Sequence, residues 1–234
     1  MKWSDEGYIL SIKKHGESSL ITSILTKEHG IHNGISRKNK KNNLYPGMKV
    51  FATWSARLEE HLGYYSIEVT PPFSTYLLKC NEEGLFMASV MEILKFSMPE
   101  RQVYSNIYKE FLKLNELIIN SENKIYKIES VLIFLNFILR ELGYPIDINN
   151  CCVTGSLDNL LYISPKSGRA VCKSAGEEYS TKLLKYPKYY KCTKDEINES
   201  NIKEALKITY FFIMKRLVSR PELMVNTNQI IQKL

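Results

Sequence analysis

The residues of this chain best suited to chemistry form a short cationic run. Four fixed positive charges fall within five positions of the stretch NGISRKNKKNNLYPG, at Arg37, Lys38, Lys40 and Lys41. Like charges this close repel one another in water, whereas along a phosphate backbone they displace condensed counterions and gain free energy. The run therefore predicts a nucleic-acid contact; the alternative is a solvated loop tip without a ligand.

The charge of the whole chain supports a polyanionic partner. The 234 residues carry a net charge of +7, divided as +3 over residues 1–78, −2 over 79–150 and +6 over 151–234. A basic beginning and a basic end suggest that more than one part of the molecule touches the polyanion. Four further basic residues are predicted to extend the surface that contacts the nucleic acid: Lys13, Lys14, Lys49 and Arg57.

Cysteine and histidine spacing does not predict a metal site. Cys151 and Cys172 fall where the thiolates of a zinc ribbon would converge, but Thr154 and Ala175 occupy the second position of each C-x2-C pair. We therefore expect no cofactor and no bound zinc, and we interpret the two cysteines as buried free thiols. His29 and His32 lie three apart around a tight turn without a second ligand pair, and are interpreted as turn residues.

Catalytic motifs are missing from the sequence. None of GxSxG, HExxH, GxxxxGK[ST] or GxGxxG occurs, and the run Glu59-Glu60-His61 has no partner nucleophile. We predict a binding protein that is not an enzyme.

Two kinds of periodicity divide the chain into elements that would position these residues. Short strands are predicted at 7–15, 19–30, 31–36, 50–58 and 63–69, which favours a small barrel of the OB type. Within VFATWSARL, alternation places Trp54 in the core and leaves Phe51 and Arg57 at the surface. After Pro71 and Pro72 the period becomes helical, with helices predicted at 84–97, 104–120, 124–143 and 201–219.

The predicted fold class is therefore α+β. An OB-fold domain at 1–75 precedes a helical domain at 76–234, whose residues from about 147 to 192 are rich in loops. The first residues do not form a secretory leader, no apolar run is long enough for a bilayer, and an odd number of cysteines suits reduced thiols. We expect a cytoplasmic protein without a membrane partner.

Several stretches, in order along the chain, resemble the RecO family of bacterial DNA-repair and recombination mediators. They are WSDEGYIL, HGESS, TKEHGIHNG, LYPGMKV, WSARLEEHLG, ELGYPIDINNCCVTG and YISPKSGRAV. The resemblance implies an OB fold on a helical domain with a zinc-ribbon-like insert, which is degenerate at about 147–192 of this chain and keeps Cys151 and Cys172 as remnants of four zinc ligands. It further implies binding of single- and double-stranded DNA, annealing of strands, and help in loading RecA onto strands coated by single-strand binding protein. It also implies RecR as a partner, and Arg37 and Lys38 as the first DNA-binding positions.

The family resemblance also implies contact with the C-terminal tail of single-strand binding protein, which is acidic and ends in apolar residues. The apolar run ITYFFIM lies between basic residues spaced by four, so we predict a cation-rimmed groove for the tail that uses Lys207, Arg216 and Arg220. Two alternatives remain open. One is an OB-fold RNA-binding protein, and the other is an adaptor that binds single-strand binding protein without binding DNA.

Overall fold

The computed structural model describes all residues except 38–43, 59 and 71–80, and it divides into two compact units. The first comprises Met1–Asn120 and Arg220–Ile230, and the second comprises Ser121–Ser219 and Ile231–Leu234. The first unit thus joins the first five strands to two complete helices and to most of the last helix. The predicted domain boundary at residue 75 lies within the undescribed segment 71–80 and stays a prediction.

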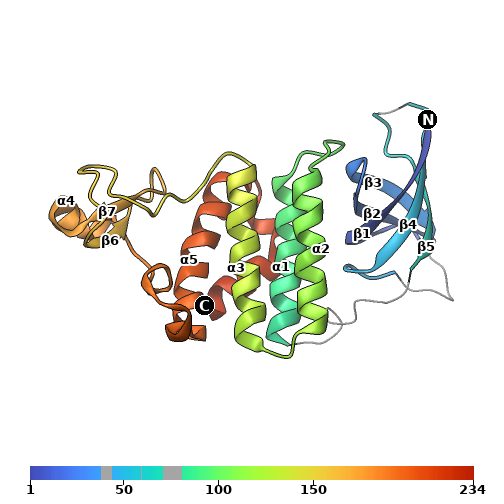
Figure 1. The fold of residues 1–234 in the computed structure, drawn as a ribbon. Coiled ribbons are helices and arrows are strands. Elements are labelled where there is room, and N and C mark those ends of the chain that lie inside the picture. The colour runs from blue at the N-terminus through green and yellow to red at the C-terminus, as the bar shows by residue number, and fades with distance from the viewer. Residues whose placement is uncertain (38–43, 59, 71–80) are drawn as a thin grey trace. The chain divides into compact units, whose positions relative to one another are not determined.

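The first unit contains a closed five-stranded barrel with the strand order β1-β2-β3-β5-β4, which confirms the predicted OB type (Figure 1). The strands are β1 (Lys2–His15), β2 (Ser19–Thr26), β3 (Gly30–Arg37), β4 (Lys49–Ser55) and β5 (Tyr64–Val69). All neighbouring pairs are antiparallel except β3 and β5, which meet at Ile35 and Tyr64. The first strand begins five residues earlier than predicted, because Lys2–Glu6 pair with β4.

Alternation along the strands fills the barrel. Val50, Ala52 and Trp54 on β4 are buried, while Phe51 between them is 44% exposed. This confirms the predicted inward position of Trp54, which packs with Ile9 and other apolar residues of the barrel core. Burial of such side chains is the main source of the free energy that holds the barrel together.

Two helices of the first unit accompany the barrel, α1 (Glu82–Ser97) and α2 (Ser105–Asn120). The connection between them crosses close to the turn at Gly30, which has φ of +70°, and a Cβ there would clash with the backbone of Gln102. The Arg101 N–H donates to the Ile31 carbonyl oxygen at 2.8 Å. Backbone contact therefore fixes this connection against the barrel.

A carboxylate of α1 caps the first turn of the last helix, α6 (Val225–Lys233). Glu92 accepts hydrogen bonds from the backbone N–H groups of Asn226 and Thr227 at 3.1 and 2.9 Å, and from both of their side chains. A carboxylate is favourable there because the first N–H groups of a helix lack intrahelical partners and carry partial positive charge.

The second unit contains a helix pair and a small sheet. The helices α3 (Lys124–Glu141) and α5 (Glu199–Arg216) pack on each other, and the sheet has the order β7-β6-β8. Its strands are β6 (Leu160–Ile163), β7 (Ala170–Cys172) and β8 (Leu184–Lys185), and the short α4 (Lys173–Gly176) follows β7. In α3 the apolar side chains at helical spacing are buried at the centre of the helix, whereas Ile125 in the first turn is 37% exposed.

Short 3-10 turns complete the second unit. They are η2 (Glu177–Lys182), η3 (Lys188–Lys191) and η4 (Lys194–Glu196), and a further one, η5 (Pro221–Leu223), lies in the first unit. Within the described parts of the chain, no helix is both long enough and apolar enough to span a bilayer.

Candidate nucleic-acid interface

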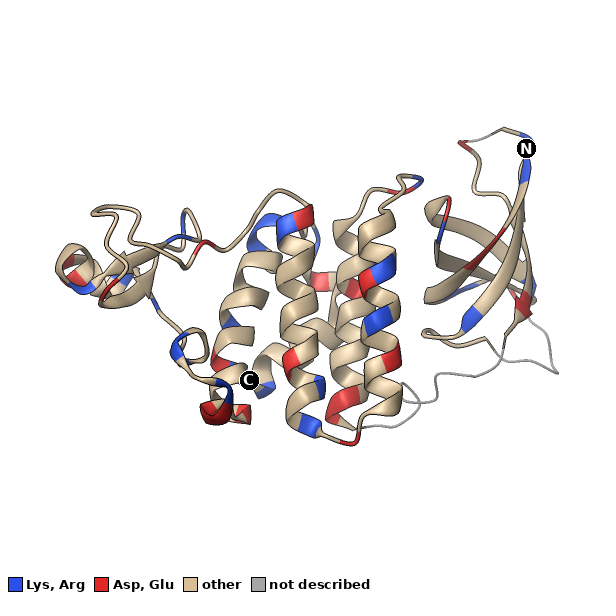
Figure 2. Ribbon diagram, in the orientation of Figure 1, with Lys and Arg blue, Asp and Glu red and all other residues tan. Residues whose placement is uncertain are grey.

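Strand register brings three predicted cations to one end of the β1–β2–β3 sheet. Lys13 and Lys14 pair across to β2, whose Ser19 lies opposite Arg37 on β3. Alternation places Lys13 and Arg37 on the outer face of the sheet and Lys14 on the inner face, at the barrel lip. All three are exposed, and Figure 2 shows the basic residues of the strands in blue.

The remaining cations of the predicted run continue directly from Arg37. Lys38, Lys40 and Lys41 lie outside the described residues. In sequence they follow Arg37, which is the last residue of β3.

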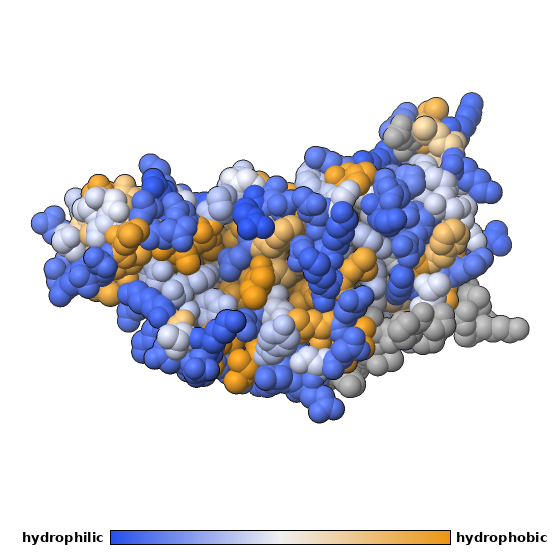
Figure 3. Space-filling view, viewed as in Figure 1, coloured by the Kyte–Doolittle hydropathy of each residue, from blue (hydrophilic) through white to orange (hydrophobic). Residues whose placement is uncertain are grey.

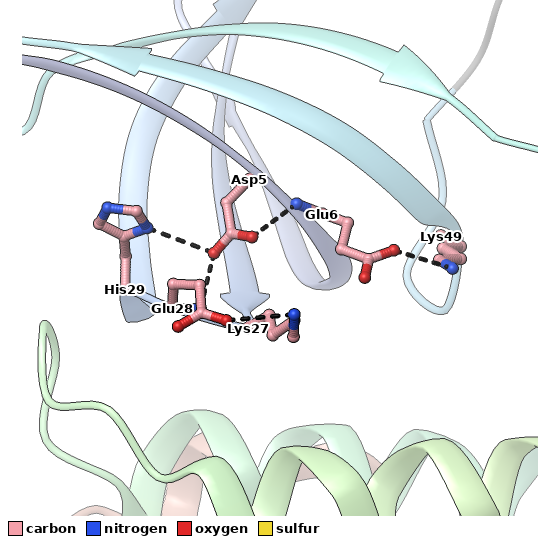
Figure 4. Close-up of polar contacts among 6 residues, drawn as sticks. All are labelled: Asp5, Glu6, Lys27, Glu28, His29 and Lys49. Atoms are coloured by element: carbon pink, nitrogen blue, oxygen red, sulfur yellow. Dashed lines mark hydrogen bonds and ion pairs between the residues drawn. The ribbon is translucent and has the colours of Figure 1, made fainter.

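Lys49 and Arg57 differ from this group. Lys49 lies opposite Tyr8 on β1, and its Nζ is 3.0 Å from a carboxylate oxygen of Glu6, an ion pair shown in Figure 4. Arg57 is exposed and follows the other end of β4. Of the predicted cations, only Lys13, Lys14 and Arg37 thus lie together. Lys49 is already paired with a carboxylate, and Arg57 lies beyond the other end of β4.

A cation that sequence analysis did not include lies beside Lys13. Lys95 on α1 donates from Nζ to Ser11 Oγ at 2.6 Å, and Ser11 shares the outer face of β1 with Lys13. Burial, and after it the positive charge of Lys13, lower the pKa of Lys95. Lys95 joins the cations of β1 and β3 only because α1 packs on β1. No sequence motif around position 95 predicts a DNA-binding residue there.

Another part of the first unit combines aromatic and titratable side chains around a hollow of about 440 Å³. The rings of Trp3 and His29 stack at 4.1 Å between centroids, and Trp3 stacks with Trp54 at 5.7 Å. His32 meets Trp3 and Trp54 edge-on. The lining also contains charged side chains of both signs, which are Lys2, Arg101 and Glu28.

The interpretation of His32 as a turn residue is wrong. It lies within β3 and is 6% exposed, because the turn ends at Gly30 and the strand alternation points its ring inward. Burial, and after it the electrostatic effects of Arg101 and His29, lower the pKa of His32 to about 4, against a backbone hydrogen bond with His29 that raises it. The imidazole is therefore neutral near pH 7, and its Nδ1 has no hydrogen-bond partner among the residues that the structure describes.

His29 does lie in the turn, where a buried carboxylate organises the backbone (Figure 4). Asp5 is 7% exposed and accepts from the backbone N–H groups of Glu6 at 2.8 Å and Glu28 at 2.7 Å. Its second oxygen also lies 3.2 Å from His29 Nδ1. Asp5 thus fixes the turn that carries His29, whose ring lines the hollow.

The remnant cysteines form a small cluster in the second unit. The Cys172 N–H donates to Cys151 Sγ at 3.2 Å, Thr154 Oγ1 lies 3.5 Å from Cys172 Sγ, and Ser174 Oγ lies 3.3 Å from the same sulfur. Burial raises the pKa of the Cys151 thiol, but hydrogen bonds from Thr154 and from backbone N–H groups outweigh it and lower the pKa to about 6.

This donor set does not fit zinc. A structural site needs four thiolate or imidazole ligands, whereas two sulfur atoms here face hydroxyl groups and backbone N–H groups. Among the described residues, no group of three His, Cys, Asp or Glu side chains is arranged to hold a metal ion. The cluster instead packs with Leu160 and Val171 as a small core.

The cations predicted to bind an acidic tail do not form the expected pattern. The prediction that Arg216 and Arg220 share one side of a helix is wrong, because α5 ends at Arg216 and Arg220 lies in the other compact unit. Arg216 covers the Phe212 ring at 4.8 Å and donates to the Lys166 carbonyl oxygen at 3.1 Å. Lys207 is exposed.

The apolar run ITYFFIM is mostly core. Thr209, Tyr210, Phe212 and Ile213 are buried, which leaves only half-buried residues for a surface.

A different apolar surface occurs on α3. A hollow of about 370 Å³ is lined by Ile133, Phe137, Pro145 and neighbouring residues, and the guanidinium of Arg140 lies 5.1 Å from the centre of the Phe137 ring. Ile133 is 57% exposed. Apolar side chains reach the surface among polar ones over the helices in Figure 3.

Comparison with known proteins gives matches along nearly the whole chain. A family model described as "Recombination protein O N terminal" matches residues 1–73, and one described as "Recombination protein O C terminal" matches residues 83–222. The chain is 33% identical to a DNA repair protein RecO of Afipia carboxidovorans, over 93% of this chain and 89% of that protein.

Two further relatives extend this result. A DNA repair protein RecO of Rhodopseudomonas palustris strain TIE-1 is 38% identical over 86% of this chain and 80% of its own length. One from Bartonella quintana is 32% identical over 100% of this chain and 98% of that protein.

Proposed function

Because the chain belongs to the RecO family, we propose that it acts as a recombination mediator in DNA repair. In this proposal it binds single- and double-stranded DNA, brings complementary strands together by neutralising their charge, and works with RecR. It also helps to load RecA onto strands that are coated by single-strand binding protein. We assign it no catalytic step.

One observation carries the DNA-binding part of the proposal. Lys13, Lys14 and Arg37 come from two strands that are separated in sequence, and register brings them to one end of the sheet. In sequence, the basic residues Lys38, Lys40 and Lys41 follow Arg37. A cationic edge of this kind contacts the phosphate backbone of any sequence and releases counterions. Lys95 adds a fourth described cation beside it.

Binding of labelled single strands across a range of salt concentrations tests this part. Replacement of Arg37, Lys38, Lys40 and Lys41 by alanine is expected to weaken binding of every sequence, and to lower the magnitude of the log–log salt slope by about 0.7 for each phosphate that the variant no longer neutralises. A matched control removes four exposed lysines of the second unit: Lys173, Lys182, Lys185 and Lys188. Equal weakening in the two variants would mean that only net charge matters.

The same assay separates the two alternatives. An RNA-binding protein would prefer RNA to DNA of equal length, and an adaptor would bind no naked DNA even at low salt. Either result would contradict the proposed mediator.

We propose further that the tail of single-strand binding protein docks on the second unit, at the hollow beside Arg140. An apolar hollow next to an exposed guanidinium suits a peptide that ends in apolar residues and carries acidic ones. The exposed Lys207 and the partly engaged Arg216 remain as the predicted alternative, together with Arg220.

A fluorescent peptide of that tail distinguishes the two locations. Replacement of Arg140 by alanine is expected to weaken peptide binding, and binding of the parent should weaken as salt rises. The triple variant with alanine at Lys207, Arg216 and Arg220 is the comparison. If only the triple variant fails to bind the peptide, the hollow on α3 is not the site.

A further inference from the structure

Two free cysteines of the second unit lie in contact although they are 21 residues apart in sequence. The backbone N–H of Cys172, the last residue of β7, donates to Cys151 Sγ at 3.2 Å. Both side chains belong to the small core beside the sheet. Folding of the small sheet therefore holds the two thiols against each other.

The geometry of the pair suits a disulfide. Because the N–Cα bond is about 1.46 Å long, Cys172 Cα lies within about 4.7 Å of Cys151 Sγ. Disulfides join cysteines whose Cα atoms are about 4.4–6.8 Å apart. Hydrogen bonds with Ser174 and Thr154 lower the pKa of Cys172, and one with the Cys151 thiol opposes them. The two thiols thus already interact, and a bond between the sulfur atoms needs only a small rearrangement of their side chains.

One exposed residue contacts both sulfur atoms. The backbone N–H of Thr154 donates to Cys151 Sγ at 3.5 Å, and Thr154 Oγ1 lies 3.5 Å from Cys172 Sγ. Thr154 and its neighbours Val153 and Gly155 are exposed, although the cysteines themselves are buried. The sulfur atoms therefore lie directly beneath a surface turn, where a small local opening admits a small oxidant.

The state of the Cys151 thiol supports reaction with such an oxidant. Its pKa of about 6 makes it mostly thiolate near pH 7, and the thiolate is the form that peroxides oxidise. Cys172 lies beside it as a second thiol that can resolve the oxidised sulfur. In a reducing compartment, disulfides from such pairs are typically transient.

We propose that Cys151 and Cys172 form a reversible disulfide under oxidising conditions, which makes this cluster a redox-sensitive staple of the small sheet. The bond joins the turn at 151–156 to the end of β7. It restricts the unfolded chain between the two cysteines and so stabilises the sheet.

Hydrogen peroxide supplies the oxidant in two balanced steps. The Cys151 thiolate attacks a peroxide oxygen, the O–O bond breaks, and sulfenic acid and hydroxide form; the hydroxide takes a proton from the solvent. The Cys172 sulfur then attacks the sulfenic sulfur, the S–S bond forms, and water leaves with the thiol proton. The two sulfur atoms together lose two electrons, which the two water molecules formed from peroxide retain. A thiol reductant reverses the change by exchange.

Peptide mapping of the full chain tests the proposal. Folded protein is treated with hydrogen peroxide, blocked with N-ethylmaleimide and digested with trypsin without reductant. Cleavage after Lys and Arg puts Cys172 on peptide 170–173, and both Cys151 and Cys152 on peptide 141–166. We expect these two peptides to be joined, with a mass below their sum by two hydrogen atoms, and to separate after dithiothreitol.

A matched pair of variants identifies the reacting sulfur on the longer peptide. Cys151 and Cys152 are neighbours, but only Cys151 accepts from the Cys172 N–H. Cys152→Ser should keep the joined peptides, whereas Cys151→Ser should reduce their yield about tenfold. In urea this difference between the two variants should disappear, since only the fold distinguishes the neighbouring thiols.

Three results would overturn the proposal. One is recovery of Cys172 as a blocked thiol after peroxide has oxidised other cysteines of the same sample. Another is sulfinic acid at Cys151 without joined peptides, and the third is an equal yield from the two folded variants. The readout is a covalent bond in the absence of DNA, so each of these results leaves the proposed function standing. The peptide map of the parent decides the question even if a variant fails to fold.

Discussion

Two clusters of titratable side chains, one in the barrel and one beside the small sheet, differ in how their polar atoms are satisfied. Around Cys151 and Cys172 both sulfur atoms have a hydroxyl or N–H partner, and the cluster packs as a core. Around His32 the rings enclose a hollow, and one nitrogen has no partner in the described parts of the chain. The first cluster is thus satisfied within the fold, whereas the second keeps a ring nitrogen that is shielded from solvent and costs stability.

The largest expected effect would convert the satisfied cluster into a metal site. We predict that the double variant Thr154→Cys with Ala175→Cys binds about one zinc per chain and gains several kcal/mol of stability, because it completes four thiolates. Thermal unfolding with zinc and with chelator measures the gain. The serine double variant is the control, and the parent should respond to neither addition. No zinc in the cysteine variant would show that Cys151 and Cys172 are not placed as remnants of such a site.

The next effect concerns the orphan histidine and pH. Because the folded pKa of about 4 lies below the ordinary value near 6.5, the unfolded chain binds the proton more readily. Stability is therefore fully present above about pH 6.5 and falls by up to about 3 kcal/mol as the pH drops toward 4. Urea unfolding across this window measures it, and His32→Asn should flatten the profile. An unchanged slope in that variant would assign the effect to other groups.

A smaller effect is expected at the carboxylate that holds His29 beside the hollow. Replacement of Asp5 by alanine leaves the backbone N–H of Glu28 without its acceptor, and should lower the free energy of unfolding by about 2 kcal/mol. The change should also loosen the stacking of His29 on Trp3, seen as altered tryptophan emission. Glu6→Gln is the control, since its pair with Lys49 is exposed and worth less than about 1 kcal/mol. Equal destabilisation of the two variants would contradict the role given to Asp5.

The smallest effect tests whether the thiol cluster depends on any single hydrogen bond. Thr154→Val removes the hydroxyl group near Cys172 Sγ and keeps the side-chain shape. Because Thr154 is exposed and water can replace its contact, the decrease in stability should stay below about 1 kcal/mol. Chemical denaturation measures it, and a decrease of several kcal/mol would mean that this cluster, like the hollow, has polar atoms that nothing else satisfies.

Local patterns in the sequence were sufficient to predict much of the fold. Period-two alternation in β4 placed Trp54 in the core, and helical periodicity predicted α1, α2 and α3 to within about two residues at each end. Both patterns depend on neighbours along the chain, since side-chain direction follows directly from backbone period. The missing second thiols at Thr154 and Ala175 were also visible in the sequence, because a C-x2-C motif is local.

Only the tertiary structure decided which residues meet across elements. Register across β2 brings Arg37 to the edge with Lys13, and packing of α1 on β1 adds Lys95. Closure of the barrel makes His32, which the spacing had placed in a turn, a buried ring with an orphan nitrogen. The sequence alone determined the order and type of most elements and the cationic run. The sequence alone could not determine these contacts, because they depend on how segments distant in sequence pair and pack. The periodicity of one segment carries no information about that.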